Sequence, residues 1–143
     1  MTYEDFLESN GELTYTNVGT SMMPLLKQHR DLFTVRRKGS ARCRAGDVVL
    51  YRRPPNKYVL HRVVEVRKKD YVILGDNCIK KEYGITDGDI IGVMTGYVRK
   101  GRTHTVKDRS YRIYKAYIMH TIPLRVLFKK VKLKTKRTVK RFL

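Results

Sequence analysis

The chain has 143 residues, 41% of them hydrophobic and ten of them glycine, which suits one folded domain or two at most and argues against global disorder. Its apolar runs are far shorter than the roughly 18–20 residues that a bilayer-spanning helix needs. The formal net charge of +19 attracts polyanions in general, whether nucleic acid, anionic lipid or an acidic partner, and does not choose among them.

The first thirteen residues, MTYEDFLESNGEL, are acidic and lack the apolar core of a secretory signal. The two cysteines, Cys43 and Cys78, do not have C-x-x-C spacing, so the sequence indicates neither a disulfide framework nor a zinc site. We therefore expect a cytoplasmic protein without an export signal, and no pattern in the sequence indicates a cofactor or a metal.

The predicted elements begin with a short helix over residues 2–9. Thr2 is its expected N-cap, acids occupy the first turn, and Asn10-Gly11 ends it. Alternating or β-branched runs then predict strands at 12–17, 31–37, 47–51, 58–66, 71–74, 90–94 and 95–98. Short strands without intervening helices predict a mostly β, antiparallel fold that is rolled or barrel-like.

The pattern becomes helical after Lys107, and Pro123 separates two expected helices. Residues 109–143 hold twelve Lys and Arg and no acid, which leaves a charge of only +7 for residues 1–108. The sequence therefore predicts a β domain over 1–108 and a basic, amphipathic helical tail over 109–143. Its apolar positions include Tyr111, Tyr114, Ile118, Leu124, Leu127, Phe128, Val131, Val139, Phe142 and Leu143.

Three short phrases in the β region carry groups suited to nucleophilic catalysis: GTSMMPLL with Ser21, YVLHRVVEV with His61, and LGDN with Asp76. A serine hydroxyl is a poor nucleophile until a neighbouring base removes its proton, and a histidine with a pKa of about 6.5 is such a base. A carboxylate behind the histidine fixes its tautomer. Ser21, His61 and Asp76 are therefore a candidate triad.

Five phrases, GTSMMPLL, RAGDVVLY, LHRVVEV, LGDN and DIIGVMTGYVRKGR, resemble in order and spacing the signal peptidase I family of serine proteases. They run from about residue 17 to residue 101. The resemblance is closest to the histidine-base branch found in archaea, the endoplasmic reticulum and some Gram-positive bacteria. It implies a signal-peptidase-type core, with Ser21 as nucleophile and His61 as general base. His61 stands directly before Arg62, where lysine-type relatives have their lysine.

The acid of the site is left open between two residues. Asp76 matches the family's G-D-N phrase and is placed slightly ahead for that reason, although an Asp-Asn turn commonly uses its side chain to bond its own backbone. In the histidine branch a second acidic residue about six places on can orient the base. Glu82 occupies that place here.

The oxyanion and substrate positions depart from the family pattern at Gly19, where many signal peptidases have a serine. The developing charge would then be met by the Ser21 backbone N–H, with Thr20 or Asn17 as further candidates, and losing one donor costs on the order of 10²–10³ in rate. Met22 and Pro24 are either core residues beside a turn or part of the wall that receives a small substrate side chain.

The resemblance implies a serine endopeptidase that cuts leader-type or signal-type peptides or preproteins in extended conformation, after small residues. Signal peptidases carry an N-terminal membrane anchor that the sequence here does not match, so we expect residues 109–143 to make peripheral contact with an anionic membrane. The alternatives are an inactive peptidase homologue and a nucleic-acid-binding module. The sequence has no helix-turn-helix, zinc or aromatic RNA-binding pattern, which disfavours nucleic acid. A self-cleaving repressor is disfavoured because it uses a lysine base.

Overall fold

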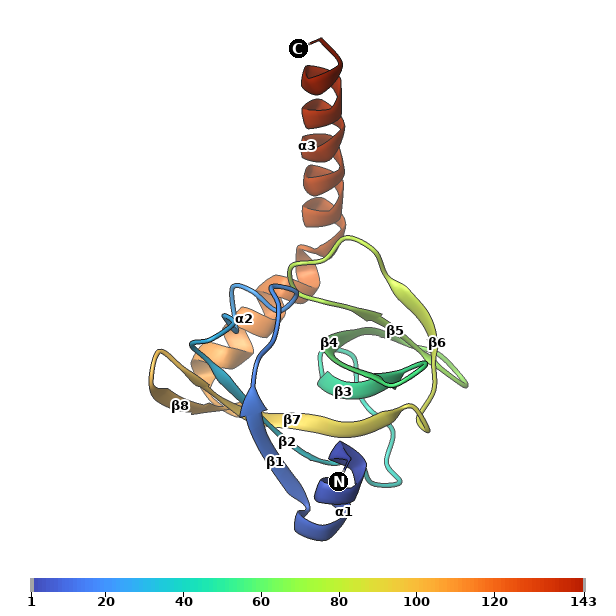
Figure 1. Ribbon diagram of the computed structural model, residues 1–143, viewed down its shortest axis with the longest axis vertical. Coiled ribbons are helices and arrows are strands. Elements are labelled where there is room, and N and C mark those ends of the chain that lie inside the picture. The colour runs from blue at the N-terminus through green and yellow to red at the C-terminus, as the bar shows by residue number, and fades with distance from the viewer. Residues whose placement is uncertain (1, 143) are drawn as a thin grey trace.

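The computed structural model describes residues 2–142, and the surroundings of side chains over 2–137. The chain is mostly β with a short N-terminal helix and two C-terminal helices, as Figure 1 shows. In chain order the elements are α1 (Tyr3–Asn10), β1 (Glu12–Thr16), β2 (Leu32–Arg37), β3 (Val48–Arg53), β4 (Lys57–Val66), β5 (Tyr71–Leu74), β6 (Glu82–Ile85), β7 (Ile90–Arg99), β8 (Arg102–Thr105), α2 (Arg109–His120) and α3 (Ile122–Phe142).

Helix α1 begins and ends where the capping signals predict. The Thr2 side chain accepts from the Asp5 backbone N–H while Asp5 accepts in return, which satisfies two of the amides that a helix start leaves without partners. Gly11 ends the helix with φ +77°, a left-handed conformation that glycine adopts without steric cost. The buried Leu7 anchors the helix against the sheet.

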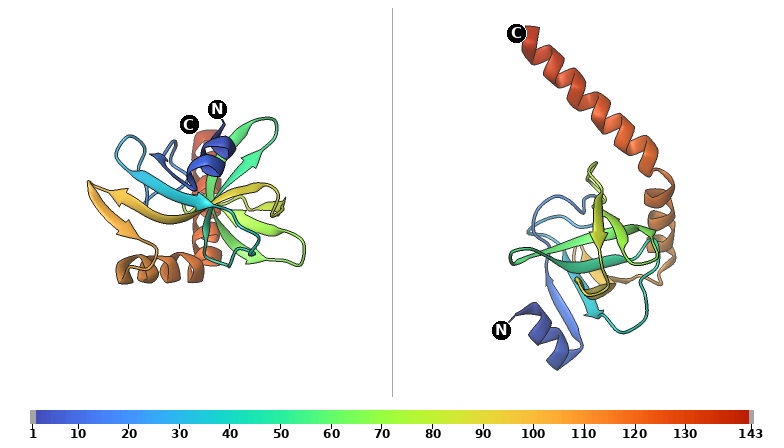
Figure 2. Two further views of the ribbon diagram at one scale, coloured as in Figure 1. Left: turned by 90° about the horizontal axis from the view of Figure 1, so that it is seen from below. Right: turned by 90° about the vertical axis from the view of Figure 1, so that its right-hand side faces the viewer.

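The strands form one antiparallel sheet in the order β1-β2-β7-β3-β4-β5-β6, with β8 paired to β7. The sheet is strongly twisted and curls on itself (Figure 2). Its end strands β1 and β6 are not paired with each other within the described residues, so the sheet stays open instead of closing into a barrel. The predicted antiparallel β architecture is confirmed in this coarser form.

Two strands were not predicted, and one predicted break does not occur. β7 runs without interruption through the expected boundary between residues 94 and 95. β6 is short, half-exposed and contains Gly84 at φ +78°, while β8 is the largely polar and exposed segment RTHT. β8 has no apolar alternation, and β6 has only Tyr83 and Ile85, which is too short a run to identify a half-buried strand in a sequence.

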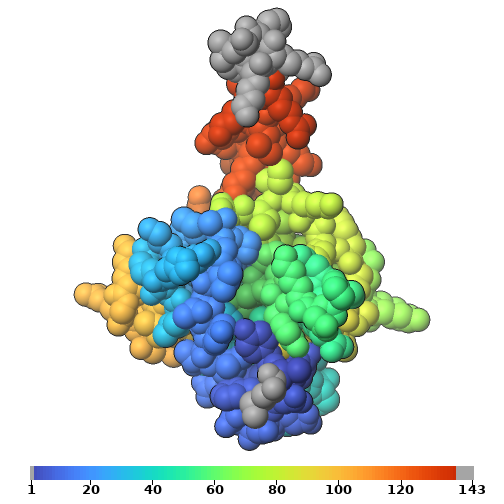
Figure 3. Space-filling view, in the orientation of Figure 1, coloured from blue at the N-terminus to red at the C-terminus, as the bar shows by residue number. Residues whose placement is uncertain are grey.

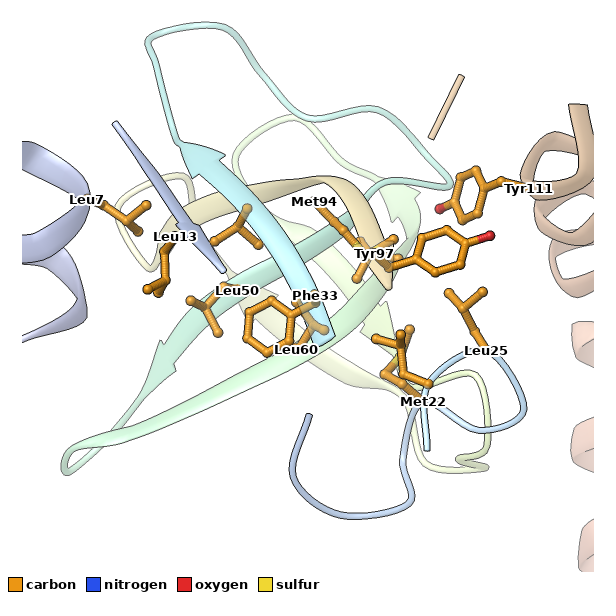
Figure 4. Close-up of a cluster of buried hydrophobic side chains, with 13 residues drawn as sticks. Leu7, Leu13, Met22, Leu25, Phe33, Leu50, Leu60, Met94, Tyr97 and Tyr111 are labelled. Atoms are coloured by element: carbon orange, nitrogen blue, oxygen red, sulfur yellow. The ribbon is translucent and has the colours of Figure 1, made fainter. Parts of the chain in front are cut away.

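The two faces of the sheet bury two separate hydrophobic clusters. Along β3, Val48 and Leu50 belong to one cluster and Val49 and Tyr51 to the other, because successive strand residues point to opposite faces. Figure 4 shows the first cluster, in which Tyr111 of α2 lies near Tyr97 of β7, with ring centroids 5.7 Å apart.

The predicted 109–143 segment divides into two helices that differ in how they pack. Helix α2 lies against the sheet and buries Tyr111 and Ile118. Helix α3 has Pro123 as its second residue, as expected for a helix start, and projects away from the body (Figures 1 and 3). The end of the predicted tail, Leu143, lies outside the described residues. No helix within residues 2–142 is both long enough and apolar enough to cross a membrane.

Candidate active site

Ser21 lies in the connection between β1 and β2, held by buried neighbours. Met22 and Leu26 are fully buried, and the Leu26 backbone N–H donates to the Met22 carbonyl at 3.0 Å. Gly19 adopts φ +82°, and its N–H donates to Gln28 Oε1 at 2.6 Å. These buried side chains and hydrogen bonds hold the segment in place, while Ser21 itself stays half-buried.

His61 lies on β4 between two buried residues, Leu60 and Arg62. Its own side chain is half-buried on the opposite face from that of Arg62. Burial lowers the pKa of His61 to about 4, against the opposing effect of the Glu82 carboxylate. Because a buried imidazolium loses its hydration, the ring is neutral at any pH well above 4 and can accept a proton.

Ser21 and His61 line one cavity of about 440 Å³. Gly75 lies where the two meet: a β-carbon there would come within 2.8 Å of the Ser21 carbonyl oxygen and 3.0 Å of His61 Cδ2. Among the described residues the Ser21 side chain has no hydrogen bond, neither to His61 nor to another group. The sequence-predicted nucleophile and base thus share one cavity, with the hydroxyl free, and such pairs often tighten only when substrate binds.

The phrase Gly75-Asp76-Asn77 holds the serine segment through Asn77. The Asn77 backbone N–H donates to the Ser21 carbonyl at 2.8 Å, and its side-chain amide donates to the Thr20 carbonyl at 3.1 Å. These two bonds join the end of β5 to the serine segment across a sequence separation of more than fifty residues. They position Ser21 relative to the strand pair that carries His61.

Asp76, the acid that the sequence placed slightly ahead, is bound to Arg62 and has no hydrogen bond to His61. Both of its oxygens accept from the Arg62 guanidinium, at 2.8 and 2.9 Å, and the Tyr114 hydroxyl donates to it at 2.8 Å. The Arg62 and Asp76 side chains are completely buried. Arg62 also donates to the Tyr111 hydroxyl at 3.0 Å. Asp76 therefore faces the other side of β4, because alternation along the strand sends His61 and Arg62 in opposite directions.

Glu82, the second candidate acid, reaches His61 through a tyrosine. The Tyr51 hydroxyl donates to Glu82 Oε1 at 2.8 Å and lies 3.3 Å from His61 Nδ1. Arg53 holds the same carboxylate, with its Nε donating to Glu82 Oε2 at 3.2 Å. Although burial opposes the effect, the hydrogen bonds from Arg53 and Tyr51 lower the pKa of Glu82, so the group is an anion at neutral pH.

This arrangement fixes the His61 tautomer. Burial and then the bond to Glu82 raise the pKa of Tyr51, so the phenol keeps the single proton that it donates to Glu82. Tyr51 can then only accept from the ring, which places the His61 proton on Nδ1. The unprotonated Nε2 is left as the proton acceptor, the state that a general base requires.

The remaining sequence-predicted positions separate into those at the cavity and those away from it. Gly19 lines the cavity, but Thr20 does not. Met22 is fully buried in the core, and Pro24 lines a different cavity, so neither lines the cavity that holds Ser21. The Asn17 side chain lines the cavity, but its amide donates to the carbonyls of Leu26 and Gly19 at 3.3 and 3.5 Å and has no hydrogen left for an oxyanion.

Sequence reasoning missed Tyr51, Arg53 and the close approach at Gly75. Val49 pairs with His61 in the β3–β4 register, so Tyr51 is the diagonal neighbour of His61 on the same face. That relation follows from the strand pairing and could have been found from the hairpin alone. The crowding at Gly75 depends on a contact with a distant loop, which strand patterns do not reveal.

Comparisons of the chain with protein-family models, with curated proteins and with solved structures give no match.

Proposed function

We propose that the chain is a serine endopeptidase of the signal peptidase I type, with Ser21 as nucleophile and His61 as general base. The observation that carries this proposal is the shared cavity, into which a free serine hydroxyl and a neutral imidazole both open. The five sequence phrases that resemble the family support the same pairing. An active peptidase accounts for a His61 ring whose Nδ1 is hydrogen-bonded to Tyr51 while its Nε2 remains available as a proton acceptor, and an inactive homologue does not.

The reaction follows from these groups. The Ser21 oxygen attacks the peptide carbonyl carbon while its proton passes to His61 Nε2, and the carbonyl electrons become an oxyanion. The intermediate collapses, and the leaving amine takes the proton from His61. A water molecule then attacks the acyl ester, gives its proton to the same nitrogen, and releases the carboxylic acid as Ser21 recovers its proton. The Ser21 backbone N–H has no bond within the described residues and is the donor available to the oxyanion.

Glu82 and Tyr51 are positioning residues in this reaction. As His61 takes the serine proton, positive charge develops on its ring. The Nδ1–H can donate to Tyr51, which is itself polarised by the Glu82 anion. The Glu82 carboxylate therefore stabilises the imidazolium through one intervening hydroxyl. In a catalytic triad the acid is instead hydrogen-bonded directly to the histidine.

An extended peptide fits the strand edge beside His61. Within residues 2–142 the start of β4, from Lys57 to Leu60, pairs only with β3, since the β4–β5 ladder starts at Arg62. Lys57 and Leu60 also line the cavity that holds Ser21. A substrate strand added to this free edge would carry its peptide bond past the serine.

The direct test is cleavage of a peptide library with small residues before the cut, read by mass spectrometry. We expect defined products from the wild-type chain and a loss of at least about 10³-fold in both Ser21→Ala and His61→Ala, because each removes one half of the pair. Equal processing by Ser21→Ala and wild type would contradict the nucleophile assignment. No cleavage of any peptide by folded wild-type protein would contradict the proposed activity.

We also propose that α3 contacts an anionic membrane surface. Four apolar residues are exposed on one side of the helix at spacings of three and four, Leu124, Leu127, Phe128 and Val131, with exposures of 69%, 60%, 69% and 55%. Basic residues occupy most of the other positions of α3. An exposed apolar stripe flanked by cations is the pattern of a helix that lies in a lipid interface.

Sedimentation with anionic and neutral vesicles tests the membrane contact. Leu127→Ser/Phe128→Ser should weaken binding to anionic vesicles at least tenfold, because two large apolar side chains lose their burial. The matched control is Ile113→Ser/Tyr117→Ser on α2, which removes two apolar residues of similar exposure, 62% and 59%, and should change binding little. Failure of the wild-type chain to bind either vesicle would remove the proposal.

A further inference from the structure

A second cavity, of about 750 Å³, lies beside the candidate active site between α3 and the connection from β5 to β6. Helix α3 is tied to that connection by two basic residues: Arg125 donates to the Asp76 carbonyl at 2.7 Å, and Lys129 donates to the Asn77 carbonyl at 2.7 Å. Figure 3 shows the connection, in yellow-green, below the base of the projecting helix. The walls of the second cavity are therefore fixed relative to the body of the protein.

The lining of this second cavity is strongly basic. Among the residues whose side chains the structure describes, Glu82 is the one acid in its lining. Six cationic side chains of that part of the chain also line it: Arg53, Lys80, Lys81, Lys129, Lys132 and Lys136. Glu82 is already bound by Arg53 and Tyr51. Lys80, Lys81, Lys132 and Lys136 have no hydrogen bond or ion pair within the described residues. Cations gathered without counter-charges repel one another, and an anionic ligand would relieve that repulsion.

The second cavity adjoins the one that holds Ser21. Arg53, His61 and Cys78 line both. A peptide seated with its scissile bond at Ser21 and His61 would therefore reach the basic cavity within a few residues, on one side of the bond. The basic side chains of the second cavity are thus placed where they could contact substrate residues on one side of the cleaved bond.

The apolar stripe and the basic cavity lie on different sides of α3. At about 100° per residue, Lys129, Lys132 and Lys136 are centred roughly 120° around the helix axis from Leu124, Leu127, Phe128 and Val131. A lipid surface that covers the apolar stripe would leave Lys129 and Lys136 turned away from the lipid, with Lys132 at its border. Over residues 2–137 no Phe, Tyr or Trp lines the second cavity, so this part of the chain offers it no stacking surface for nucleotide bases.

We propose that this basic cavity is a substrate subsite for acidic residues, so that the chain prefers peptides with Asp or Glu a few residues to one side of the cleaved bond. The inference rests on the proposed peptidase function and specifies its substrate class. Carboxylates of the bound peptide would lie among Lys80, Lys81, Lys132 and Lys136. Binding of such peptides should fall with rising salt, because the charges are partly exposed.

The test measures binding separately from cleavage by using full-length Ser21→Ala protein. Labelled peptides carry a small-residue core and a run of either Asp or Asn, placed before or after the core, and fluorescence anisotropy reports their affinity. We expect the Asp peptide in one of the two placements to bind about tenfold more tightly than its Asn counterpart. Adding Lys132→Gln/Lys136→Gln should abolish most of that difference and leave the Asn peptides unchanged.

The matched control is Lys130→Gln/Arg137→Gln, which removes two charges from the same helix at positions that do not line the second cavity. An equal loss of Asp-peptide affinity in both double variants would show attraction by net charge alone and overturn the subsite. Equal binding of Asp and Asn peptides would overturn it as well. Loss of binding to phosphatidylglycerol vesicles in Lys132→Gln/Lys136→Gln, with peptide binding intact, would assign the cavity to lipid headgroups instead.

Peptide binding by Ser21→Ala and cleavage of the same peptides by wild-type protein together distinguish the two proposals. If wild-type protein cleaves small-residue peptides without favouring the Asp series, the subsite is wrong and the peptidase stands. If Asp peptides bind through Lys132 and Lys136 but no peptide is cleaved, the acidic-peptide site stands and the proposed activity fails.

Discussion

His61 and Arg62 are neighbours in β4, and their side chains enter two very different environments on the two faces of the sheet. Arg62 is fully buried, and its guanidinium is bound by Asp76, the Tyr111 hydroxyl and the Gly46 carbonyl. His61 is half-buried, has one ring nitrogen near Tyr51, and borders two cavities.

Polar groups on the Arg62 face hold the fold together, whereas those on the His61 face remain open to solvent and ligands. On the Arg62 face the charges are paired and their hydrogen bonds are made inside the protein, which is what burial demands. On the His61 face a hydroxyl and a ring nitrogen are left open to a cavity. We therefore expect substitutions on the first face to change stability and substitutions on the second to change catalysis.

The largest expected effect on stability comes from Asp76→Asn. It leaves the buried Arg62 guanidinium without its counter-charge, which should lower the free energy of unfolding by about 3–5 kcal/mol. Urea denaturation measures the change. Glu82→Gln is the control, because the half-exposed Arg53–Glu82 pair should contribute less than about 1 kcal/mol. Similar stabilities of Asp76→Asn and wild type would contradict a structural role for Asp76.

Gly75→Ala should lower both the stability of the protein and the proposed cleavage rate. The added methyl group would meet the Ser21 carbonyl oxygen at 2.8 Å and Cys78 Sγ at 2.7 Å, closer than real contacts allow. We expect a loss of about 1–3 kcal/mol in the free energy of unfolding and at least a tenfold fall in cleavage rate, as Ser21 shifts relative to His61. Gly88→Ala serves as the control, since its nearest neighbour, Thr86 Oγ1, lies at 3.7 Å. Equal activity in Gly75→Ala and Gly88→Ala would show that the serine segment tolerates displacement.

Tyr51→Phe should act on the His61 face by removing the hydroxyl between the ring and Glu82. We expect kcat to fall about tenfold with KM nearly unchanged, because the lost interaction strengthens only as the imidazolium forms. Tyr71→Phe is the matched control: it removes a hydroxyl of another buried tyrosine, bound to Asp87 and to the Cys43 backbone N–H. That control should lose stability and keep its kcat. Equal kcat values in Tyr51→Phe and wild type would exclude the proposed relay.

The antiparallel β fold and the helix caps were predictable because they depend on local patterns. Thr2 and Gly11 bound α1 through bonds within a few residues, and the alternation in β4 is visible in its apolar positions. β6 and β8 were not predicted because most of their residues are polar or exposed. Backbone pairing with neighbouring strands holds both in the sheet, and in β6 only Ile85 is buried.

The candidate site was predictable in its residue types but not in its connections. The phrases around Ser21 and His61 identify two groups that share a cavity in the structure. The acidic residue that acts on His61 could not be identified from the sequence. The sequence motif favours Asp76, but it cannot show that the buried Arg62 binds both oxygens of that carboxylate. A link through Tyr51 depends on strand register as well as on the order of motifs.

The decisive measurement for a buried imidazole acting on Ser21 is the pH dependence of kcat/KM for peptide cleavage. The proposed mechanism requires a neutral His61, and burial lowers the pKa of that ring to about 4. We therefore expect kcat/KM to be constant at neutral pH and to fall only as pH drops through about 4. Activity that falls around pH 6.5, or a profile that persists unchanged in His61→Ala, would contradict the account of a buried imidazole acting on Ser21.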